Sequence, residues 1–147
     1  MATVEQLGTD MKAAMVAKDG VKRDTLRLVL ADMKNKQIEL GRELEGAEVL
    51  AVLTKAKKSR QDSLEQYTNA GREDLAAVER AEIEVVSAYL PEEMGEDELR
   101  EIVTAVVAEV GASSPKDMGA VMKALMPKVK GRADGKAVQR IVAELLN

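Results

Sequence analysis

The sequence has 147 residues and a formal net charge of −4, and it contains no cysteine, histidine, phenylalanine or tryptophan. Without cysteine and histidine the chain can form no disulfide and no thiolate nucleophile, and it lacks the commonest metal ligand and the usual general base. The negative net charge gives no sign of nucleic-acid binding by the whole surface, so a nucleic-acid site would have to be a local patch.

Apolar residues recur at helical spacing along the chain, and no run alternates with the period of two that is typical of strands. This pattern predicts an all-α fold. Thr3 is placed to cap the first helix, and Pro91 ends the fourth. Met15 and Ile38 are expected to point inward. The first four helices are predicted over residues 3–18, 22–40, 47–69 and 74–90.

A linker is predicted at residues 91–95, where the composition changes, and three further helices follow it. The sixth helix begins at Ser114–Pro115 and is interrupted by Pro127. The last helix begins after Asp134, whose side chain can cap it. We therefore expect two linked helical bundles: a four-helix domain over residues 1–91 and a small three-helix domain over residues 96–147.

Gly119 lies near the inward face of the sixth predicted helix, where alanine would be more stable by about 1 kcal/mol. A glycine here predicts the close approach of another backbone, either from within the small bundle or from a partner. We interpret the methionines on the same face as core residues, with a docking groove as the alternative. These are Met118, Met122 and Met126.

Charge is segregated along the second predicted domain, with acidic residues from Pro91 to Ala112 and basic residues from Ser113 to Arg140. Helical spacing places the basic side chains away from the apolar stripes, and such a patch can hold several phosphates. The alternative is an ordinary solvated face that is balanced by the acidic fifth helix. The basic residues are Lys116, Lys123, Lys128, Lys130, Arg132, Lys136 and Arg140.

The turn from Gly131 to Lys136 has the composition of a phosphate-binding loop, but its details do not fit. Such a loop needs four residues between its glycines and Ser or Thr after its lysine, whereas here there are three residues and Ala137 follows. A phosphate near the start of the last helix, beside Arg132, is an alternative use of this turn, although Asp134 would compete for the same N–H groups.

Two carboxylates of the fourth helix, Glu79 and Glu82, lie close to its apolar stripe, where unpaired charges destabilise the fold. We predict that they pair with Lys58, Arg60 or Arg27 across the bundle. This structural role is preferred to a catalytic carboxylate pair.

Six stretches, taken in order, resemble the YqeY family, small bacterial proteins related to the tail of the GatB subunit of the tRNA-dependent amidotransferase. The resemblance covers nearly the whole chain. No single stretch is specific, but the ordered set is. The stretches are Lys34-Asn35-Lys36-Gln37-Ile38-Glu39, Lys57-Lys58-Ser59-Arg60-Gln61-Asp62-Ser63, Ala70-Gly71-Arg72-Glu73-Asp74-Leu75, Tyr89-Leu90-Pro91, Asp117-Met118-Gly119-Ala120-Val121-Met122 and the turn from Gly131 to Lys136.

This resemblance implies two linked helical bundles and a link to tRNA. In the amidotransferase the related tail contacts tRNA, while the glutaminase and the activation chemistry reside in other domains. A label as a carbon–nitrogen ligase with glutamine as amide donor would therefore be inherited from GatB. By analogy, the residues expected to contact tRNA are Lys116, Lys123, Lys130, Arg132, Lys136 and Arg140.

The leading hypothesis is an accessory module that binds tRNA or another folded RNA. The alternative is a protein-interaction module that docks on a translation or amidotransferase component. We expect no catalytic activity of its own, no cofactor and no metal. Because no apolar run approaches the roughly 20 residues that span a bilayer and the first residues lack signal-peptide features, we expect a cytoplasmic protein without a membrane partner.

Overall fold

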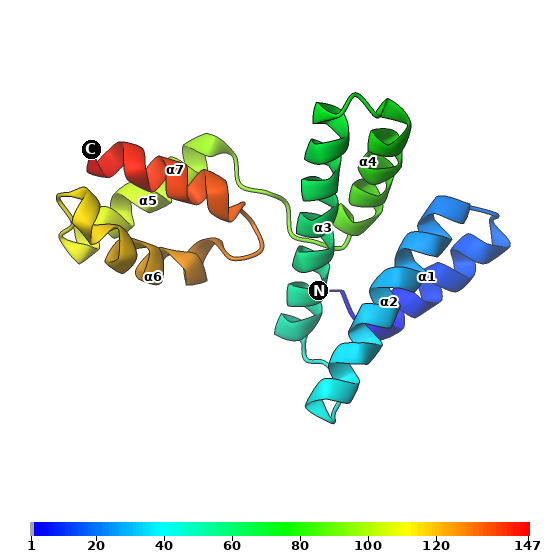
Figure 1. Cartoon of the computed structure of the whole chain (residues 1–147). Helices are drawn as coiled ribbons and strands as arrows, with labels where there is room; N and C mark the ends of the chain where they lie inside the picture. The colour runs from blue at the N-terminus through cyan, green and yellow to red at the C-terminus, as the bar shows by residue number, and fades with distance from the viewer. Residues whose placement is uncertain (1) are drawn as a thin grey trace. The chain divides into compact units, whose positions relative to one another are not determined.

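The computed structural model describes residues 2–147, and this part of the chain contains seven α-helices, one short 3₁₀ helix and no strand. The predicted all-α fold is confirmed. The chain divides into two compact units, Met1–Leu90 and Pro91–Asn147, and each unit has its own apolar core. The helices are labelled in Figure 1.

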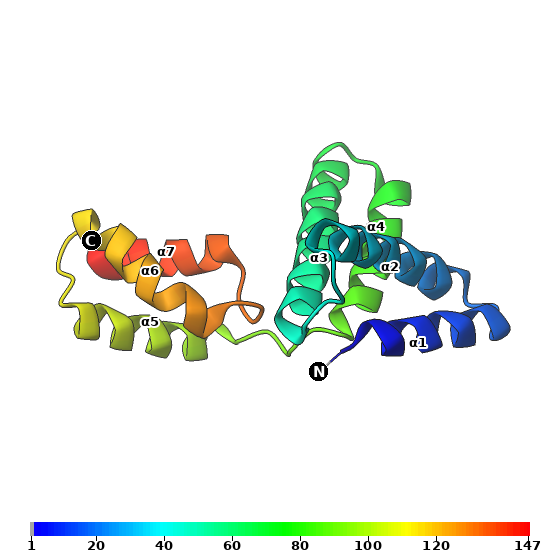
Figure 2. The ribbon, with the colours of Figure 1, turned by 90° about the horizontal axis from the view of Figure 1, so that it is seen from below.

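The first unit consists of α1 (Val4–Val16), α2 (Gly20–Leu40), α3 (Gly46–Asn69) and α4 (Glu73–Ser87). Helix α1 lies along α2 in both ribbon views (Figures 1 and 2), α3 packs on α4, and α2 also contacts α3 and α4. The core is aliphatic, because the chain has no large aromatic residue to fill it apart from two tyrosines. Its buried members are Leu7, Leu26, Val29, Met33, Val49, Leu53, Ala56 and Val86.

The helix ends of this unit follow from local chemistry. The Thr3 hydroxyl accepts a hydrogen bond from the Gln6 N–H at 3.1 Å, so the predicted cap of α1 is confirmed. Gly41 ends α2 in the left-handed region at φ 70°, a conformation that glycine adopts without steric strain.

Two residues that were expected to face inward do not. Ile38 is 70% exposed and Met15 is 48% exposed. Both lie close to the end of their helix: α1 ends at Val16, and the last buried residue of α2 is Met33. Helical periodicity predicts which face a residue occupies, but it does not predict how far along the helix the neighbouring helices reach.

One hydrogen bond ties the start of the first unit to its end. The Tyr89 hydroxyl donates to Asp10 Oδ2 at 2.6 Å, which joins α1 to the segment that follows α4. Burial of the phenol and its bond to Asp10 both raise the pKa of Tyr89. The tyrosine therefore stays protonated and keeps donating this hydrogen bond at physiological pH.

The loop between α2 and α3 is held by a bidentate ion pair. Both Glu48 carboxylate oxygens accept from the Arg42 guanidinium at 2.7 Å, and one also accepts the Glu45 N–H at 2.8 Å. These bonds, chiefly the one from Arg42, lower the pKa of Glu48 from 4.5 to about 2.

We expect the Glu48 carboxylate to titrate near pH 2 in the native protein and to return toward 4.5 in Arg42→Ala. Because the folded-state pKa is lowered, the pair stabilises the fold above the usual carboxyl pKa and this contribution is lost as the pH falls through the folded-state pKa. Side-chain carboxyl chemical shifts followed by NMR provide the measurement. An unchanged Glu48 pKa in Arg42→Ala contradicts this assignment.

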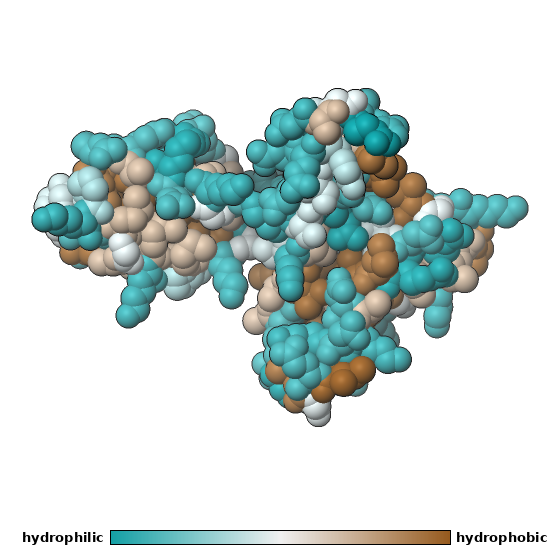
Figure 3. Space-filling model, viewed as in Figure 1, coloured by the Kyte–Doolittle hydropathy of each residue, from teal (hydrophilic) through white to brown (hydrophobic). Residues whose placement is uncertain are grey.

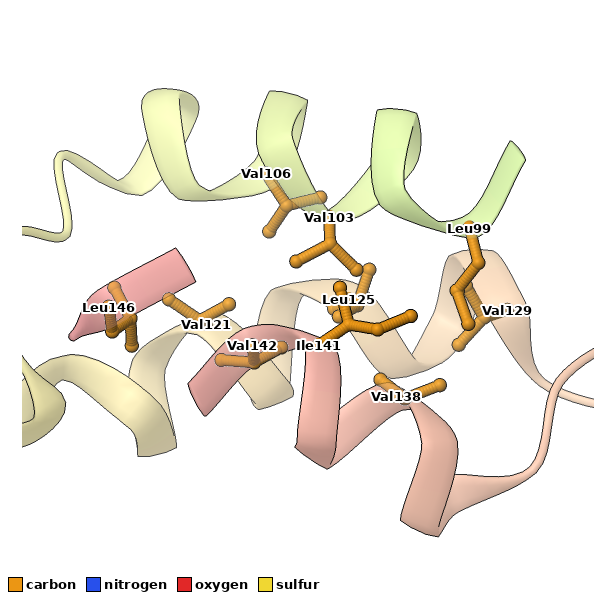
Figure 4. Close-up of a cluster of buried hydrophobic side chains, with 10 residues drawn as sticks. All are labelled: Leu99, Val103, Val106, Val121, Leu125, Val129, Val138, Ile141, Val142 and Leu146. Carbon is orange, nitrogen blue, oxygen red and sulfur yellow. The ribbon is translucent and has the colours of Figure 1, made fainter. Parts of the chain in front are cut away.

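The second unit consists of α5 (Glu96–Val110), the 3₁₀ helix η1 (Pro115–Asp117), α6 (Met118–Val129) and α7 (Gly135–Leu146). Its core contains only aliphatic side chains, which come from all three α-helices and interdigitate (Figure 4). The buried residues are Leu99, Val103, Val106, Val121, Leu125, Val129, Val138, Ile141, Val142 and Leu146.

Three local predictions in this unit are wrong. Pro127 does not interrupt α6, which continues to Val129, because its ring lies on the exposed side close to the helix end and removes a single helical hydrogen bond. Gly119 is exposed instead of inward, and a Cβ there would meet no atom within 4 Å, so no other backbone of the unit approaches it. The other alternative, the approach of a partner's backbone, stays a prediction. Asp134 stands at the N-cap of α7, but its side chain makes no capping hydrogen bond.

Candidate nucleic-acid interface

Three of the six candidate residues form a row along α6. Lys116 lies in η1, Lys123 lies on α6 and Lys130 follows its last residue, and all three are exposed. The lysines are seven residues apart, which is close to two helical turns, and of the three only Lys123 lies within the α-helix itself. At 1.5 Å per residue the row is about 20 Å long, enough to face several phosphates of a nucleic acid.

The surface beside this row is flat, because short residues share the face. Gly119, Ala120 and Pro127 lie within about 60° of the lysines around the helix axis and are exposed. Pale residues cover the second unit in the space-filling view, with hydrophilic side chains around them (Figure 3). A bulky ligand can therefore approach the α6 backbone without a steric barrier.

Two candidate residues lie on α7, one turn apart, and their surroundings differ. Arg140 binds two carboxylates, Glu144 at 3.1 Å and Glu96 at 3.3 Å, and Arg100 bridges the same two carboxylates. The bonds from Arg100, followed by those from Arg140, lower the pKa of Glu144. Lys136 has no carboxylate within ion-pair distance in residues 2–147.

Arg132 is also used within the second unit. Its Nε donates to the Glu92 carbonyl at 3.1 Å, and its Nη1 lies 3.5 Å from Glu98 Oε1. The Arg132 carbonyl accepts the Met94 N–H at 2.7 Å. These contacts fix the segment before α5 to the turn after α6, so part of the predicted linker belongs to the fold of the second unit.

The six candidates thus form two groups. Lys116, Lys123, Lys130 and Lys136, hereafter the lysine set, are exposed and make no ion pair with any carboxylate between residues 2 and 147. The two arginines are bound to the acidic start of α5. For the arginines the structure agrees with the alternative stated from the sequence, in which the acidic fifth helix balances the basic face.

The predicted ion pair of the first unit is confirmed for Glu82. Arg60 Nε lies 3.2 Å from Glu82 Oε2, with the two side chains 14% and 21% exposed. Burial, and then the neighbouring Glu82 charge, raise the pKa of Glu79, while Arg60 opposes this shift. The arrangement is that of a structural pair between α3 and α4, because the Arg60 guanidinium is fully engaged and also donates to the Ala56 carbonyl at 3.0 Å.

The family follows from comparison with known proteins. The family described as Yqey-like protein matches residues 4–146. The chain belongs to this family.

Curated relatives of this YqeY-like chain are fungal proteins named "Altered inheritance of mitochondria protein 41, mitochondrial". The protein from Clavispora lusitaniae is 32% identical over 125 residues, which cover 83% of this chain and 73% of the relative. The protein from Lachancea thermotolerans is 33% identical, over 77% of this chain and 62% of its own length. The protein from Saccharomyces cerevisiae strain S288c is 29% identical, over 94% and 66% of the two chains.

The stretches that carry the YqeY resemblance lie in both units. Residues 34–39 belong to α2 and residues 57–63 to α3, while residues 117–122 and 131–136 lie at the start of α6 and in the turn that leads into α7. In the part of the chain that the structure covers, no helix is long and apolar enough to cross a membrane. The same part holds no group of three acidic side chains placed to bind a metal ion.

Proposed function

We propose that this YqeY-like chain binds folded RNA, with tRNA as the first candidate, through the basic surface of its second unit. The observation that supports this most strongly is the lysine set: four exposed lysines on and beside α6 and α7 that form no ion pair among residues 2–147. When a lysine contacts a phosphate, counterions are released from the nucleic acid, and this release contributes to the affinity. A lysine without an ion pair can make this contact without first breaking a bond inside the protein. Arg132 and Arg140 complete the proposed site by holding the turn and α7 in place.

The proposed recognition is of backbone and shape. Both tyrosines of the chain belong to the first unit, so the second unit has no aromatic ring on which a base could stack. Phosphate contacts position a protein without reading bases, which suits the recognition of a folded RNA by its shape. The accessory role beside the tRNA-dependent amidotransferase is part of the same proposal and rests on the family's relation to the GatB tail.

The test is binding of unfractionated tRNA, titrated across salt. Changing Lys116, Lys123, Lys130 and Lys136 to alanine is expected to weaken binding at least about tenfold, and to reduce the slope of log affinity against log salt by about one for each lysine that contacts a phosphate. Fluorescence anisotropy of labelled tRNA provides the measurement.

The matched control removes four lysines of the first unit, Lys12, Lys18, Lys22 and Lys34. It changes the net charge by the same amount and is expected to bind tRNA as the native protein does. An equal loss in both variants shows attraction by overall charge and not by a site. Absence of binding at low salt rules out the RNA proposal.

A second candidate function, docking on a protein of the translation machinery, is supported by a different surface. Large apolar side chains are exposed in the first unit, among them Val16 at 86% and Leu28 at 54%. Exposed apolar side chains mark a protein-contact surface where they form one contiguous patch. The cytoplasmic location stays a prediction, and the printed name of the fungal relatives places those proteins in mitochondria.

A further inference from the structure

The first unit contains a cleft between α2 and α3 with a volume of about 500 Å³. Its lining combines the apolar Ala51, Val52 and Ala56 of α3 with charged side chains from both helices. Brown, hydrophobic residues show at the surface between these two helices in the space-filling view (Figure 3). The YqeY-like stretches 34–39 and 57–63 both contribute residues to it.

The walls of the cleft are two helix faces. On α2 the lining residues are Asp32, Asn35, Lys36 and Glu39, which lie three, four and seven residues apart. Leu28 lies one turn before Asp32 on the same face and is 54% exposed, so it extends this wall with an apolar side chain. The α3 wall runs from residue 48 to residue 60, a length of about 18 Å or three helical turns.

Both signs of charge are available to a ligand in this cleft. Asp32 on α2 and Lys55 on α3 form no ion pair within residues 2–147. Lys36 forms an ion pair with Glu39 at 3.2 Å, on the same helix, with the two side chains 41% and 68% exposed. The Lys36 charge also acts on Glu48 of α3 and helps to lower the pKa of that carboxyl group. An exposed pair of this kind contributes little and is readily exchanged for another carboxylate.

We infer that the cleft is the docking site for one amphipathic helix of a partner protein. The apolar face of the partner helix packs on Val52, Ala56 and Leu28. Carboxylates of the partner helix pair with Lys36 and Lys55, and a cation of the partner helix pairs with Asp32. This inference rests on the protein-docking candidate and is independent of RNA binding by the second unit.

The structure favours a helix over other occupants. The backbone groups of α2 and α3 are used within the helices, so an extended peptide would find no partner for its own N–H and C=O groups, whereas a helix satisfies them itself. The lining balances three carboxylates with three cations, so it offers no net attraction to the phosphates of a nucleic acid, whereas a helix can place single charges of either sign opposite their partners. Side chains at helical spacing on two walls match the repeat of a third helix.

The probe is a displayed library of about 20-residue amphipathic sequences, selected on the full chain, with the best peptide then synthesised and labelled. We expect the selected peptides to be amphipathic helices that carry acidic residues beside the apolar face. Their binding should shift backbone amide NMR signals in residues 28–39 and 48–60. Fluorescence anisotropy then compares variants.

The cleft variant Lys36→Glu/Lys55→Glu is expected to bind the peptide about tenfold or more weakly. The control Lys12→Glu/Lys34→Glu makes the same change in charge outside the cleft and is expected to bind within about twofold of the native chain. A peptide with lysine in place of its acidic residues should restore binding to the cleft variant. The cleft variant should also keep its affinity for tRNA, which separates this inference from the RNA proposal.

Failure of the library to yield any helical binder overturns the inference. So do signal shifts that lie outside the cleft, or an equal loss of affinity in the two charge variants.

Discussion

Replacing Leu125 by alanine is expected to unfold the second unit while the first unit stays folded. Leu125 is fully buried at the centre of the second core (Figure 4). A buried leucine-to-alanine change removes about 2–5 kcal/mol, and a domain of this size seldom has more than about 3–5 kcal/mol of stability. The first unit has a separate core, so its fold does not depend on this side chain.

Two-dimensional NMR of the full chain provides the measurement for Leu125→Ala. Amide signals from residues 91–147 should collapse to the narrow range of an unfolded chain, while those from the first unit keep their positions. The control is Leu145→Ala in the same unit, where the side chain is 39% exposed and a loss below about 1 kcal/mol is expected. Unfolding of both units together would contradict the independence of the two cores.

Replacing Arg60 by methionine is expected to lower the free energy of unfolding of the first unit by about 2 kcal/mol. The change leaves Glu82 without its partner in a largely buried position, next to Glu79. Breaking a fully buried pair from one side costs about 3–5 kcal/mol, and the residual exposure of this pair reduces that figure. Urea denaturation followed by tyrosine fluorescence provides the measurement.

The decrease in the free energy of unfolding caused by Arg60→Met should depend on pH in a defined direction. Burial and Glu82 already raise the pKa of Glu79, and removal of Arg60 takes away the one contribution that lowers it. A carboxyl group whose folded-state pKa is raised destabilises the fold above that pKa, and this cost disappears as the pH falls and the group takes up a proton. The deficit of the variant is therefore expected to shrink as the pH falls from neutral toward the ordinary carboxyl pKa of 4.5.

The matched control for Arg60 is Arg80→Met on α4. Arg80 binds Glu73, but both side chains are largely exposed, so its removal is expected to change the stability little and to show little dependence on pH. The double variant Arg60→Met/Glu82→Leu should recover part of the stability lost in the single variant, because no buried charge is left unpaired. A single variant as stable as the native protein would show that the pair contributes nothing.

The fold was predictable because its signals are local. The cap at Thr3, the end of the second helix at Leu40 and the apolar periodicity each depend on residues within one or two turns. Even the pairing of Glu82 with Arg60 could be inferred, since a carboxylate beside an apolar stripe requires a cation. Ile38 and Met15 were misplaced because their exposure depends on where the neighbouring helices end.

The candidate site was predictable only as a list of cations. The list did not show that Arg132 and Arg140 bind the first turn of α5, because that contact joins residues about 40 positions apart and depends on how three helices pack. Nor did the sequence show the cleft between α2 and α3. Its lining residues look like ordinary solvated faces until two helices place them opposite one another.

The location of Tyr89 in the first unit also determines which part of this protein can be followed by fluorescence. The only other aromatic side chain is Tyr67 on α3, so all intrinsic fluorescence originates in the first unit. The second unit contains no aromatic fluorophore, so its unfolding can be followed optically only by the circular dichroism of its helices. A melting experiment that records both signals at once therefore separates the two halves of the chain without a single label.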